Sequence, residues 1–584
     1  MRRDDWMVLA VVLGLSAIIY SPSLRIPITG DDWLTWRWSH HLVSTMDVSA
    51  LFTTSAFGPA SEGGTAIYRP VSLFLFGVET LLFGTWEPGF RIVTILFFLA
   101  TTVLIYAFVY RYLLPSNRTV SFIAALLYAT HSAWSEVVLM TVAQEHMVAI
   151  FFGMASLVGY ARYRSDTEKG TSLTNRWLWL ALLMMALSIF SNELTATLPG
   201  IFVLYDLLYH WRRRAALRRL FPAWAIFAGV DAIYVAIKLS IFGKLSPYGR
   251  FGFLPQLRDL AEYLINVAQR LTIGVNVFFT VVSTYLPTFK AHPLATLPIL
   301  GLWLVLPAAF VAVVIWRNRA NREMWFGLLW FVIASSIMMG RFAAHRHLAW
   351  FALGLCIAAA ALIAAIPSAY WRRVSYGLLA GYVLYHAAII ERHITIHREA
   401  GDLFAKVVAQ TQAVLPCELE RVRSPKDSTA VYYLNAPASV YDRFTNTGMY
   451  VEISNFEGIL NVLYRNATLK PVRSLSRVTI FTERSPEAWC EVRGPDSIRV
   501  HSLEGFESPD FGLYPRIGAT MKRNTTNHRF TVVEADGGLA TTIDVILDPP
   551  LTDAHTVYLA WNPEHGVTRL TWPEASASER PAGE

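Results

Sequence analysis

Two adjacent carboxylates, Asp31 and Asp32, lie in the stretch ITGDDWLTWRW, a few residues after an apolar run long enough to enter a bilayer. Three tryptophans and an arginine follow at once. An ionised side chain at the bilayer centre costs about 2.5–3.5 kcal/mol on insertion scales, so acids beside a span need an explanation. A carboxylate at the membrane interface can take a proton from a hydroxyl group, which is general-base chemistry.

Further ionisable residues lie near the ends of other apolar runs. The acidic ones are Glu136 in HSAWSEVV, Glu145 in VAQEHM and Glu193 in FSNELTATLP. The basic ones are Arg69 in IYRPVS, Arg91 in GFRIV, and Arg341, His345, Arg346 and His347 in MMGRFAAHRHLAW. Cations at headgroup level can pair with a lipid phosphate, arginine through a bidentate fork, and can stabilise the charge of a leaving phosphate. A nearby carboxylate can activate an acceptor hydroxyl, so this set predicts sugar transfer from a polyprenyl phosphate.

The composition indicates a membrane protein. Of 584 residues, 54% are hydrophobic and only 16% charged, against about a quarter charged in soluble proteins. The net charge of +7 is spread in short runs between apolar stretches, which indicates topology and argues against a nucleic-acid surface. Three cysteines provide neither a disulfide framework nor zinc-ligand spacing.

About eleven apolar runs have the length of a membrane-spanning helix. They are expected near residues 6–22, 90–112, 119–138, 143–161, 177–191, 194–210, 220–242, 294–316, 324–340, 347–366 and 373–390. Two more polar stretches, 67–86 and 259–286, are expected to be interfacial or re-entrant, or to raise the count to thirteen. Asp231 and Lys238, seven residues apart on one span, are expected to form a buried or water-lining pair.

Clusters of Lys and Arg set the predicted orientation, because short cytoplasmic loops are enriched in them. With a cytoplasmic N-terminus, six positive clusters between the spans fall on the cytoplasmic side. Residues 23–89 then contain a long first outer loop, and everything after about residue 392 lies outside. In a Gram-negative cell the membrane would be the cytoplasmic (inner) membrane and the outer side the periplasm.

The chain is therefore expected to divide into a transmembrane domain, residues 1–391, and an extracytoplasmic β-rich domain, residues 392–584. The second part contains alternating, strand-like pieces: AVYYLNA, SRVTIFT, SIRVHSL, HRFTVVEA and TIDVIL. Cys417 and Cys490 lie in it, and both a disulfide and two free thiols are compatible with their spacing.

The order of four segments resembles a known family. GDDW is followed by YRPVSLFLFGVETLLFG, then by ALLYATHSAWSEVVLMTVAQEHM, then by FSNELTATLPG. This is similar to the membrane half of GT-C glycosyltransferases, particularly the TMTC-type protein O-mannosyltransferases, whose transmembrane part precedes tetratricopeptide repeats. The resemblance covers residues 20–210 and, more weakly, 323–366.

The resemblance implies a GT-C-like membrane core, a polyprenyl-phosphate-linked sugar as donor, and Asp31 or Asp32 as the catalytic carboxylate of an inverting displacement. Asn192 replaces the family's lysine before Glu193, and a β-rich tail replaces the repeats, so the phosphate ligands and the acceptor (glycan, lipid or protein) stay open. Some GT-C enzymes bind a divalent metal and others need none. Asp31, Asp32 and His345 could hold one.

Simpler structural roles stay open for the same residues. Asp31 and Asp32 can cap an interfacial helix that begins at Trp33, inside an aromatic belt. Glu193 can cap the following helix, and Arg69 can reach headgroups by snorkelling. Glu136 can be a solvated turn residue. Contact with lipid headgroups alone can explain the basic turn with Arg341, His345, Arg346 and His347.

Two other functions also fit a chain with many spans. A transporter or lipid flippase would place polar groups near the bilayer midplane and show repeated halves, whereas the charges here gather at one face. A non-catalytic assembly protein would use the tail and need the membrane part only as an anchor, for which eleven spans are more than required.

Overall fold

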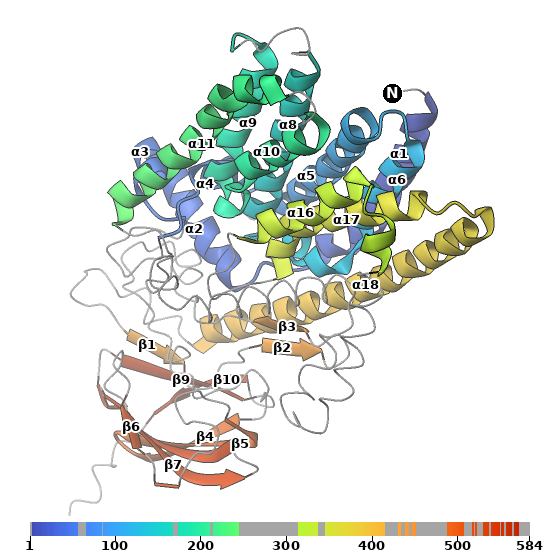
Figure 1. The fold of residues 1–584 in the computed structure, drawn as a ribbon. Helices are drawn as coiled ribbons and strands as arrows, with labels where there is room; N and C mark the ends of the chain where they lie inside the picture. The colour runs from blue at the N-terminus through green and yellow to red at the C-terminus, as the bar shows by residue number, and fades with distance from the viewer. Residues whose placement is uncertain are drawn as a thin grey trace, which may run out of the picture. The chain divides into compact units, whose positions relative to one another are not determined.

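A computed structural model of the chain describes a series of helices followed by a set of strands (Figure 1). The described residues are 3–56, 66–84, 86–166, 173–210, 214–243, 313–336, 345–414, 430–433, 439–442, 447–450, 488–506, 517–518, 520–522, 529–536, 539–548, 550–553, 556–562 and 566–571. They form two compact units, each described here by itself. The first combines Met1–Ile26 with Trp38–Ile394, and the second combines Pro27–Arg37 with Thr395–Glu584.

The N-terminal two thirds of the described chain is helical. Its first helices are α1 (Arg3–Tyr20), α2 (Gly30–Thr45), α3 (Val48–Thr53), α4 (Pro70–Phe83), α5 (Glu87–Phe108), α6 (Arg118–Thr130) and α7 (Glu136–Leu139). Then come α8 (Gln144–Asp166), α9 (Arg176–Ser191), α10 (Leu198–His210), α11 (Arg214–Phe242), α16 (Arg322–Ser335), α17 (Leu348–Ala364) and α18 (Ala369–Val414). Short helical turns connect several of them: η1 (Ser21–Arg25), η3 (Val109–Leu113), η4 (Ser132–Trp134), η6 (Glu193–Thr195) and η8 (His345–His347).

Local sequence signals fix where these helices begin. The side chains of Asn117, Asn175 and Asn321 accept hydrogen bonds from backbone N–H groups in the first turns of α6, α9 and α16. Such caps satisfy N–H groups that have no partner inside the helix. Pro70 occupies the first position of α4, where its missing N–H costs nothing and its fixed φ suits a helix. The beginning of α4 therefore sets the place of Arg69 just before it.

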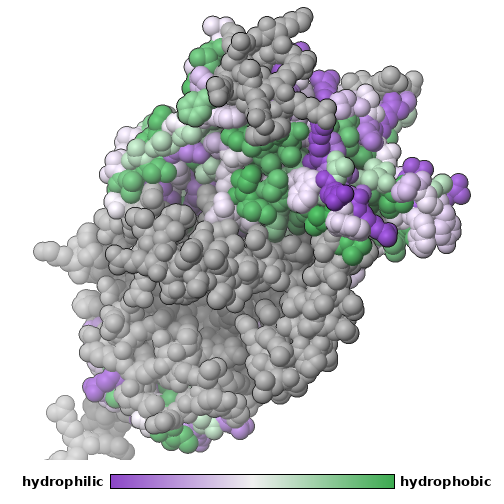
Figure 2. All heavy atoms as spheres, viewed as in Figure 1, coloured by the Kyte–Doolittle hydropathy of each residue, from purple (hydrophilic) through white to green (hydrophobic). Residues whose placement is uncertain are grey.

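Several helices have the length and apolarity of membrane spans. Four described helical stretches qualify by both criteria: Asp4–Arg25, Glu87–Leu113, Phe221–Phe242 and Ala369–Thr411. Helices α4, α6, α9 and α17 are apolar but shorter. On the face in Figure 2, apolar side chains gather over the described helices. Large exposed apolar residues such as Ile18, Leu82 and Leu384 fit a surface that meets lipid.

Most predicted spans coincide with described helices. The run 119–138 is an exception, because α6 ends at Thr130 and a tight turn with the short helix α7 follows. Helix α18 also differs from the prediction, since it continues to Val414 where the β-rich region was expected from residue 392. The predicted stretches 259–286 and most of 294–316 lie outside the described residues.

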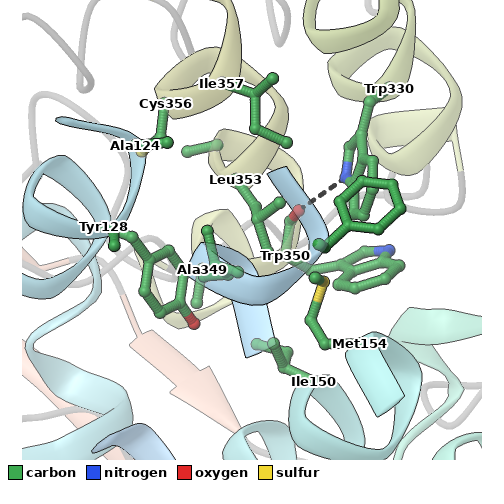
Figure 3. Close-up of a cluster of buried hydrophobic side chains, with 14 of the residues drawn as sticks. Ala124, Tyr128, Ile150, Met154, Trp330, Ala349, Trp350, Leu353, Cys356 and Ile357 are labelled. Carbon is green, nitrogen blue, oxygen red and sulfur yellow. Dashed lines mark hydrogen bonds between the residues drawn. The ribbon is translucent and has the colours of Figure 1, made fainter. Parts of the chain in front are cut away.

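A large apolar core joins the helices. Trp330 of α16 and Trp350 of α17 pack with ring centroids 4.9 Å apart, and the indole N–H of Trp330 donates to the Trp350 carbonyl at 3.0 Å (Figure 3). Gly327 and Gly354 let the backbones of the two helices come close, because a Cβ on either would collide with the other glycine's carbonyl oxygen. The core thus makes α16 and α17 a tightly packed pair.

A buried ion pair, with further hydrogen bonds, connects helices α8, α10 and α11. Arg164 of α8 pairs with Asp206 of α10, with Nε 2.5 Å from Oδ1, and both side chains are buried. Tyr160 of α8 and Trp224 of α11 also donate hydrogen bonds to Asp206. The carboxylate of Asp206 therefore has three partners inside the helical bundle.

The C-terminal unit contains the strands. They are β1 (Ala430–Tyr433), β2 (Ser439–Asp442), β3 (Thr447–Tyr450), β4 (Ala488–Gly494), β5 (Ser497–Phe506), β6 (Thr520–Lys522), β7 (Arg529–Asp536), β8 (Leu539–Ile546), β9 (Thr556–Asn562) and β10 (Gly566–Leu570). The largest described sheet is antiparallel, in the order β4-β5-β8-β7-β6. Its alternating apolar residues Ile498, Val500, Ile543 and Val545 form a core.

The predicted fold class is confirmed: a helical membrane protein is followed by a region with β-strands. The predicted strand pieces AVYYLNA, SIRVHSL, HRFTVVEA and TIDVIL overlap β1, β5, β7 and β8. SRVTIFT and Cys417 lie outside the described residues, while Cys490 is a free thiol in β4.

Candidate functional site

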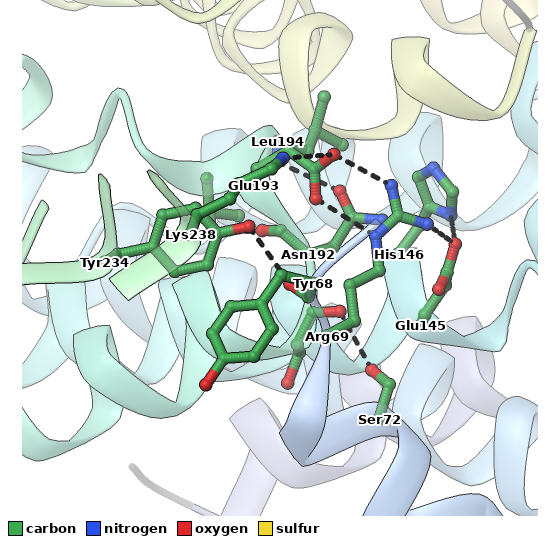
Figure 4. Close-up of polar contacts among 12 residues, drawn as sticks. Tyr68, Arg69, Ser72, Glu145, His146, Asn192, Glu193, Leu194, Tyr234 and Lys238 are labelled. Carbon is green, nitrogen blue, oxygen red and sulfur yellow. Dashed lines mark hydrogen bonds and ion pairs between the residues drawn. The ribbon is translucent and has the colours of Figure 1, made fainter. Parts of the chain in front are cut away.

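Arg69 is the centre of the candidate site. It precedes Pro70, which starts α4, so the chain enters the helix in a fixed direction. Its Nε lies 3.0 Å from Oε2 of Glu193, and Nη2 lies 3.1 Å from Oε1 (Figure 4). Nη1 makes a second ion pair, with Glu145. One guanidinium therefore joins two carboxylates that are far apart in the sequence.

Both carboxylates belong to the starts of helical segments. Glu145 lies in the first turn of α8, and Glu193 opens η6 after the cap residue Asn192, whose side chain accepts from the Leu194 N–H at 3.0 Å. Negative charge is favourable at a helix N-terminus because the free N–H groups give that end a partial positive charge. The fold thus brings two acids and Arg69 to one place.

Lys238 of α11 completes what we call the ionic cluster: Arg69, Glu145, Glu193 and Lys238. Its Nζ lies 4.0 Å from Oε1 of Glu193 and 5.9 Å from the ring centroid of Tyr234. The hydroxyl of Tyr234 donates to the carbonyl of Tyr68 at 3.0 Å, which fixes α11 next to Arg69. The expected pair of Lys238 with Asp231 is wrong, because Lys238 faces Glu193 instead.

The cluster is poorly exposed, so its charges act strongly on each other. The side chains of Arg69 and Glu193 are 12% and 20% exposed. Burial alone would raise the pKa of Glu193, but the charges of Arg69 and Lys238 and the hydrogen bond from Arg69 outweigh it and lower the pKa to about 2. Burial would lower the pKa of Arg69, and the two carboxylates raise it further than burial lowers it. Both groups are ionised at any physiological pH.

A second set of polar residues lies on α7, η8 and the first turn of α8. The backbone N–H of Arg346 donates to Oε2 of Glu136 at 3.1 Å, and Nη1 of Arg346 lies 3.7 Å from the same oxygen. His347 and His146 face each other with ring centroids 5.3 Å apart. Nδ1 of His146 in turn lies 3.7 Å from Glu145, so this set continues into the ionic cluster.

Arg91 is placed differently from the other predicted cations. It is 1% exposed and lies in the second turn of α5. Its Nε donates to the carbonyl of Ile26 at 3.2 Å and its Nη1 to the carbonyl of Leu139. These contacts satisfy buried carbonyl groups and connect α5 to the ends of η1 and α7.

The two aspartates lie in the first turn of α2. Asp32 is buried, and its backbone N–H donates to the carbonyl of Thr29 at 2.9 Å. They belong to the segment Pro27–Arg37, which groups with the C-terminal unit. The side chains of Asp31 and His345, and the whole of Arg341, lie outside the described residues. Within the described part of the chain, no group of three or more His, Cys, Asp and Glu side chains could hold a metal.

Lys238 and Glu145 are the residues that sequence reasoning left out of the site. Glu145 was recognised as an acid at a span end, and that signal was sufficient to include it. Lys238 was noted as a charge on an apolar span, but it was paired with Asp231 and was therefore not assigned to the site. Chemically, the cluster offers one guanidinium, one ammonium group and two carboxylates, which suits an anionic, hydroxyl-bearing ligand.

No protein-family model matches the chain. Among curated proteins, protein O-mannosyl-transferase TMTC4 of Homo sapiens is 26% identical over 154 residues, 24% of this chain and 21% of that protein. Protein O-mannosyl-transferase TMTC1 of Mus musculus is 27% identical over 215 residues, 34% of this chain and 22% of that protein. The chain thus spans about a fifth of the length of the curated relatives it matches. The predicted resemblance to this family of transferases is confirmed.

Two solved structures are also similar. The Archaeoglobus fulgidus oligosaccharyltransferase in the apo form aligns with a TM-score of 0.40 and 12% identity, covering 82% of this chain and 65% of that one. ArnT from Cupriavidus metallidurans bound to undecaprenyl phosphate aligns with a TM-score of 0.39 and 13% identity, covering 93% and 98%. These scores are too low to establish a common fold.

Proposed function

We propose that the chain is a GT-C-type membrane glycosyltransferase that moves a sugar from a polyprenyl-phosphate donor to an acceptor on the outer face of the membrane. The ionic cluster is the main support. It brings cations and carboxylates from the start of α4 and from α8, η6 and α11 together, with little exposure to solvent. Similarity to protein O-mannosyl-transferases supports the reaction class.

In this proposal Asp31 or Asp32 is the catalytic base. The acceptor hydroxyl attacks the anomeric carbon, its proton goes to the carboxylate, and the bond from that carbon to the phosphate oxygen breaks. The phosphate leaves with the electron pair, and because the hydroxyl attacks from the opposite face in a single displacement, the anomeric centre inverts. Arg69, Arg341, His345 and Arg346 stabilise the charge that develops on the phosphate. Glu136 and Glu193 orient these cations and the substrate hydroxyls.

Arg91 takes a supporting role in the same proposal. Its donors already reach two backbone carbonyls, so it serves the site by fixing the start of α5 and not by binding phosphate. Lys238 joins the phosphate-binding cations in its place. Its Nζ is 4.0 Å from its nearest carboxylate, so it is less tightly held than Arg69.

The proposed location is the cytoplasmic membrane of a bacterium, with the N-terminus inside and the strand-rich region, residues 392–584, outside. The positive clusters between the helices support this orientation. The acceptor is then a glycan, a lipid or a protein of the cell envelope. A polyprenyl phosphate is the proposed carrier, because the cations of the ionic cluster can pair with a phosphate.

The deciding experiment compares envelope glycans, glycolipids and glycoproteins by mass spectrometry with and without this gene. A missing sugar on one acceptor class is the expected result, and it identifies donor and acceptor together. The chain with Asp31→Asn or Asp32→Asn is then expressed at normal level in the deletion strain. Loss of a general base is expected to lower transfer by roughly 100- to 10,000-fold in at least one variant.

The matched control is Asp166→Asn, which removes a carboxylate from an exposed pair with Arg162 on α8. It is expected to restore the sugar fully. Full restoration by both Asp31→Asn and Asp32→Asn would remove the proposed base. An unchanged set of envelope sugars, combined with counterflow of a lipid phosphate in proteoliposomes, would favour the transporter instead.

A further inference from the structure

The segment between α6 and α7 leads directly into Glu136, the first residue of α7, and contacts α18. The backbone N–H of Ser132 donates to Nδ1 of His386 at 3.2 Å, and its Oγ lies 2.9 Å from the same nitrogen. Oγ of Ser135 lies 2.7 Å from Nδ1 of His393. Two serines of one turn are therefore each matched by a histidine of a distant helix.

The spacing of the two histidines explains how one helix reaches both serines. Seven residues are close to two helical turns, so His386 and His393 lie on one stripe of α18, roughly 10 Å apart. Because the Ser132 N–H donates to Nδ1 of His386, that nitrogen carries no proton and acts as an acceptor. The ring of His131, at the start of the turn, stacks on that of His386, with ring centroids 4.2 Å apart.

All of these contacts are buried. His131, Ser132, Ser135, His386 and His393 are each at most 8% exposed. A buried polar group without a partner is costly, so each serine–histidine contact favours one arrangement of the turn over others. The turn also has hydrogen bonds of its own, from the Ser135 N–H to the Ser132 carbonyl at 3.1 Å and from the Ala133 N–H to Nδ1 of His131 at 2.9 Å, and the two contacts with α18 add to them.

Glu136 follows Ser135 directly, so the contacts that hold Ser135 also restrict the position of Glu136. Its carboxylate accepts from the backbone of Arg346, and both side chains keep contact with solvent, at 29% and 25% exposure. We propose that α18 positions the Glu136–Arg346 pair, and that His393 is a positioning residue for this part of the site. The consequence for sugar transfer rests on the proposed function, whereas the consequence for the turn does not.

Replacing His393 by three side chains tests the proposal in the full chain reconstituted in nanodiscs. His393→Asn keeps a polar atom near the position of Nδ1, His393→Gln moves it toward the position of Nε2, and His393→Leu removes it. Ser135→Ala removes the same contact from the turn with a smaller change. Hydrogen exchange of residues 131–140 is measured together with transfer from undecaprenyl-phosphate mannose and with binding of undecaprenyl phosphate alone.

We expect His393→Leu and Ser135→Ala to speed exchange in residues 131–140, with other helices unchanged, and to lower transfer roughly tenfold or more. His393→Asn should restore both, His393→Gln should not, and the Leu–Ala double variant should match the single ones. Unchanged exchange in the turn, or equal loss in the Asn and Leu variants, overturns the proposal. Absence of transfer and of lipid binding in the unmodified chain counts against the proposed function alone, because the exchange comparison still decides the positioning role.

Discussion

Arg69 and Glu193, 124 residues apart, form a bidentate ion pair, with nitrogen–oxygen distances of 3.0 and 3.1 Å. Two parallel hydrogen bonds fix both the distance and the plane of the two groups, which a lysine cannot do. The pair therefore connects the start of α4 to η6 with a defined geometry.

The first prediction concerns this ion pair. Arg69→Lys keeps the charge but loses one of the two parallel bonds, and should reduce stability by about 1.5–3 kcal/mol, the usual value of a hydrogen bond to a charged group. Arg69→Gln leaves two buried carboxylates without their cation and should cost about 3–5 kcal/mol. Thermal unfolding in nanodiscs measures both. Arg162→Lys, at an exposed arginine, is the control and should change stability little. An Arg69→Lys variant as stable as the unmodified chain would contradict the bidentate geometry.

The second prediction concerns pH. The pKa of Glu193 is lowered to about 2 in the folded chain, so the unfolded chain binds the proton more tightly. The stabilisation from this group is therefore complete above the ordinary glutamate pKa, near 4.5, and is lost as the pH falls from there toward 2. The difference in unfolding free energy between the unmodified chain and Glu193→Gln should be constant from pH 8 to about 5 and shrink in more acidic buffer. A difference that already shrinks between pH 7 and 6 would refute this assignment.

The third prediction concerns the close approach of α16 and α17. A Cβ at Gly354 would lie 2.8 Å from Cβ of Trp330 and collide with the carbonyl of Gly327. Gly354→Ala should therefore reduce stability by about 3 kcal/mol or more. Gly377→Ala on α18 is the matched control, because no atom lies within 4 Å of its added Cβ. It should be neutral or stabilising by up to about 1 kcal/mol. Equal melting temperatures for the two variants would contradict the described packing.

The fourth prediction concerns the buried ion pair between Arg164 and Asp206. Asp206→Asn leaves Arg164 buried without its charge partner, and removing one member of such a pair costs about 3–5 kcal/mol. Asp166→Asn, in the exposed pair with Arg162, should change stability by no more than about 1 kcal/mol. Chemical unfolding followed by tryptophan fluorescence compares them. Two equally mild effects would contradict the buried ion pair between Arg164 and Asp206.

Much of the fold could be predicted because its signals are local. The apolar runs at 177–191 and 220–242 lie within α9 and α11, and the alternating piece SIRVHSL lies within β5. The end of α6 at Thr130 was missed because hydropathy continues through the turn that follows. The extension of α18 to Val414 was missed because the helix becomes polar after residue 391 while staying helical.

The candidate site was predictable only in part. Glu145 and Glu193 could be recognised as acidic residues at span ends, because an ionised carboxylate near lipid is costly and usually has a function. The partner of Lys238 could not be predicted, because it depends on how α11 is rotated and how deep it lies against η6. That choice is made by tertiary contacts such as the one between Tyr234 and Tyr68. The role of His386 and His393 was invisible for the same reason, since their partners lie more than 250 residues away.

The balance of the ionic cluster has a consequence for selectivity. Arg69 and Lys238 are compensated by Glu145 and Glu193, so these four residues together project little long-range field into the water. A soluble anion such as inorganic phosphate gains no steering toward them and must compete with carboxylates already in place. Under the proposed function, a headgroup tethered in the bilayer arrives instead at high local concentration, by lateral diffusion. A cluster of this kind would work undisturbed in a salt-rich compartment.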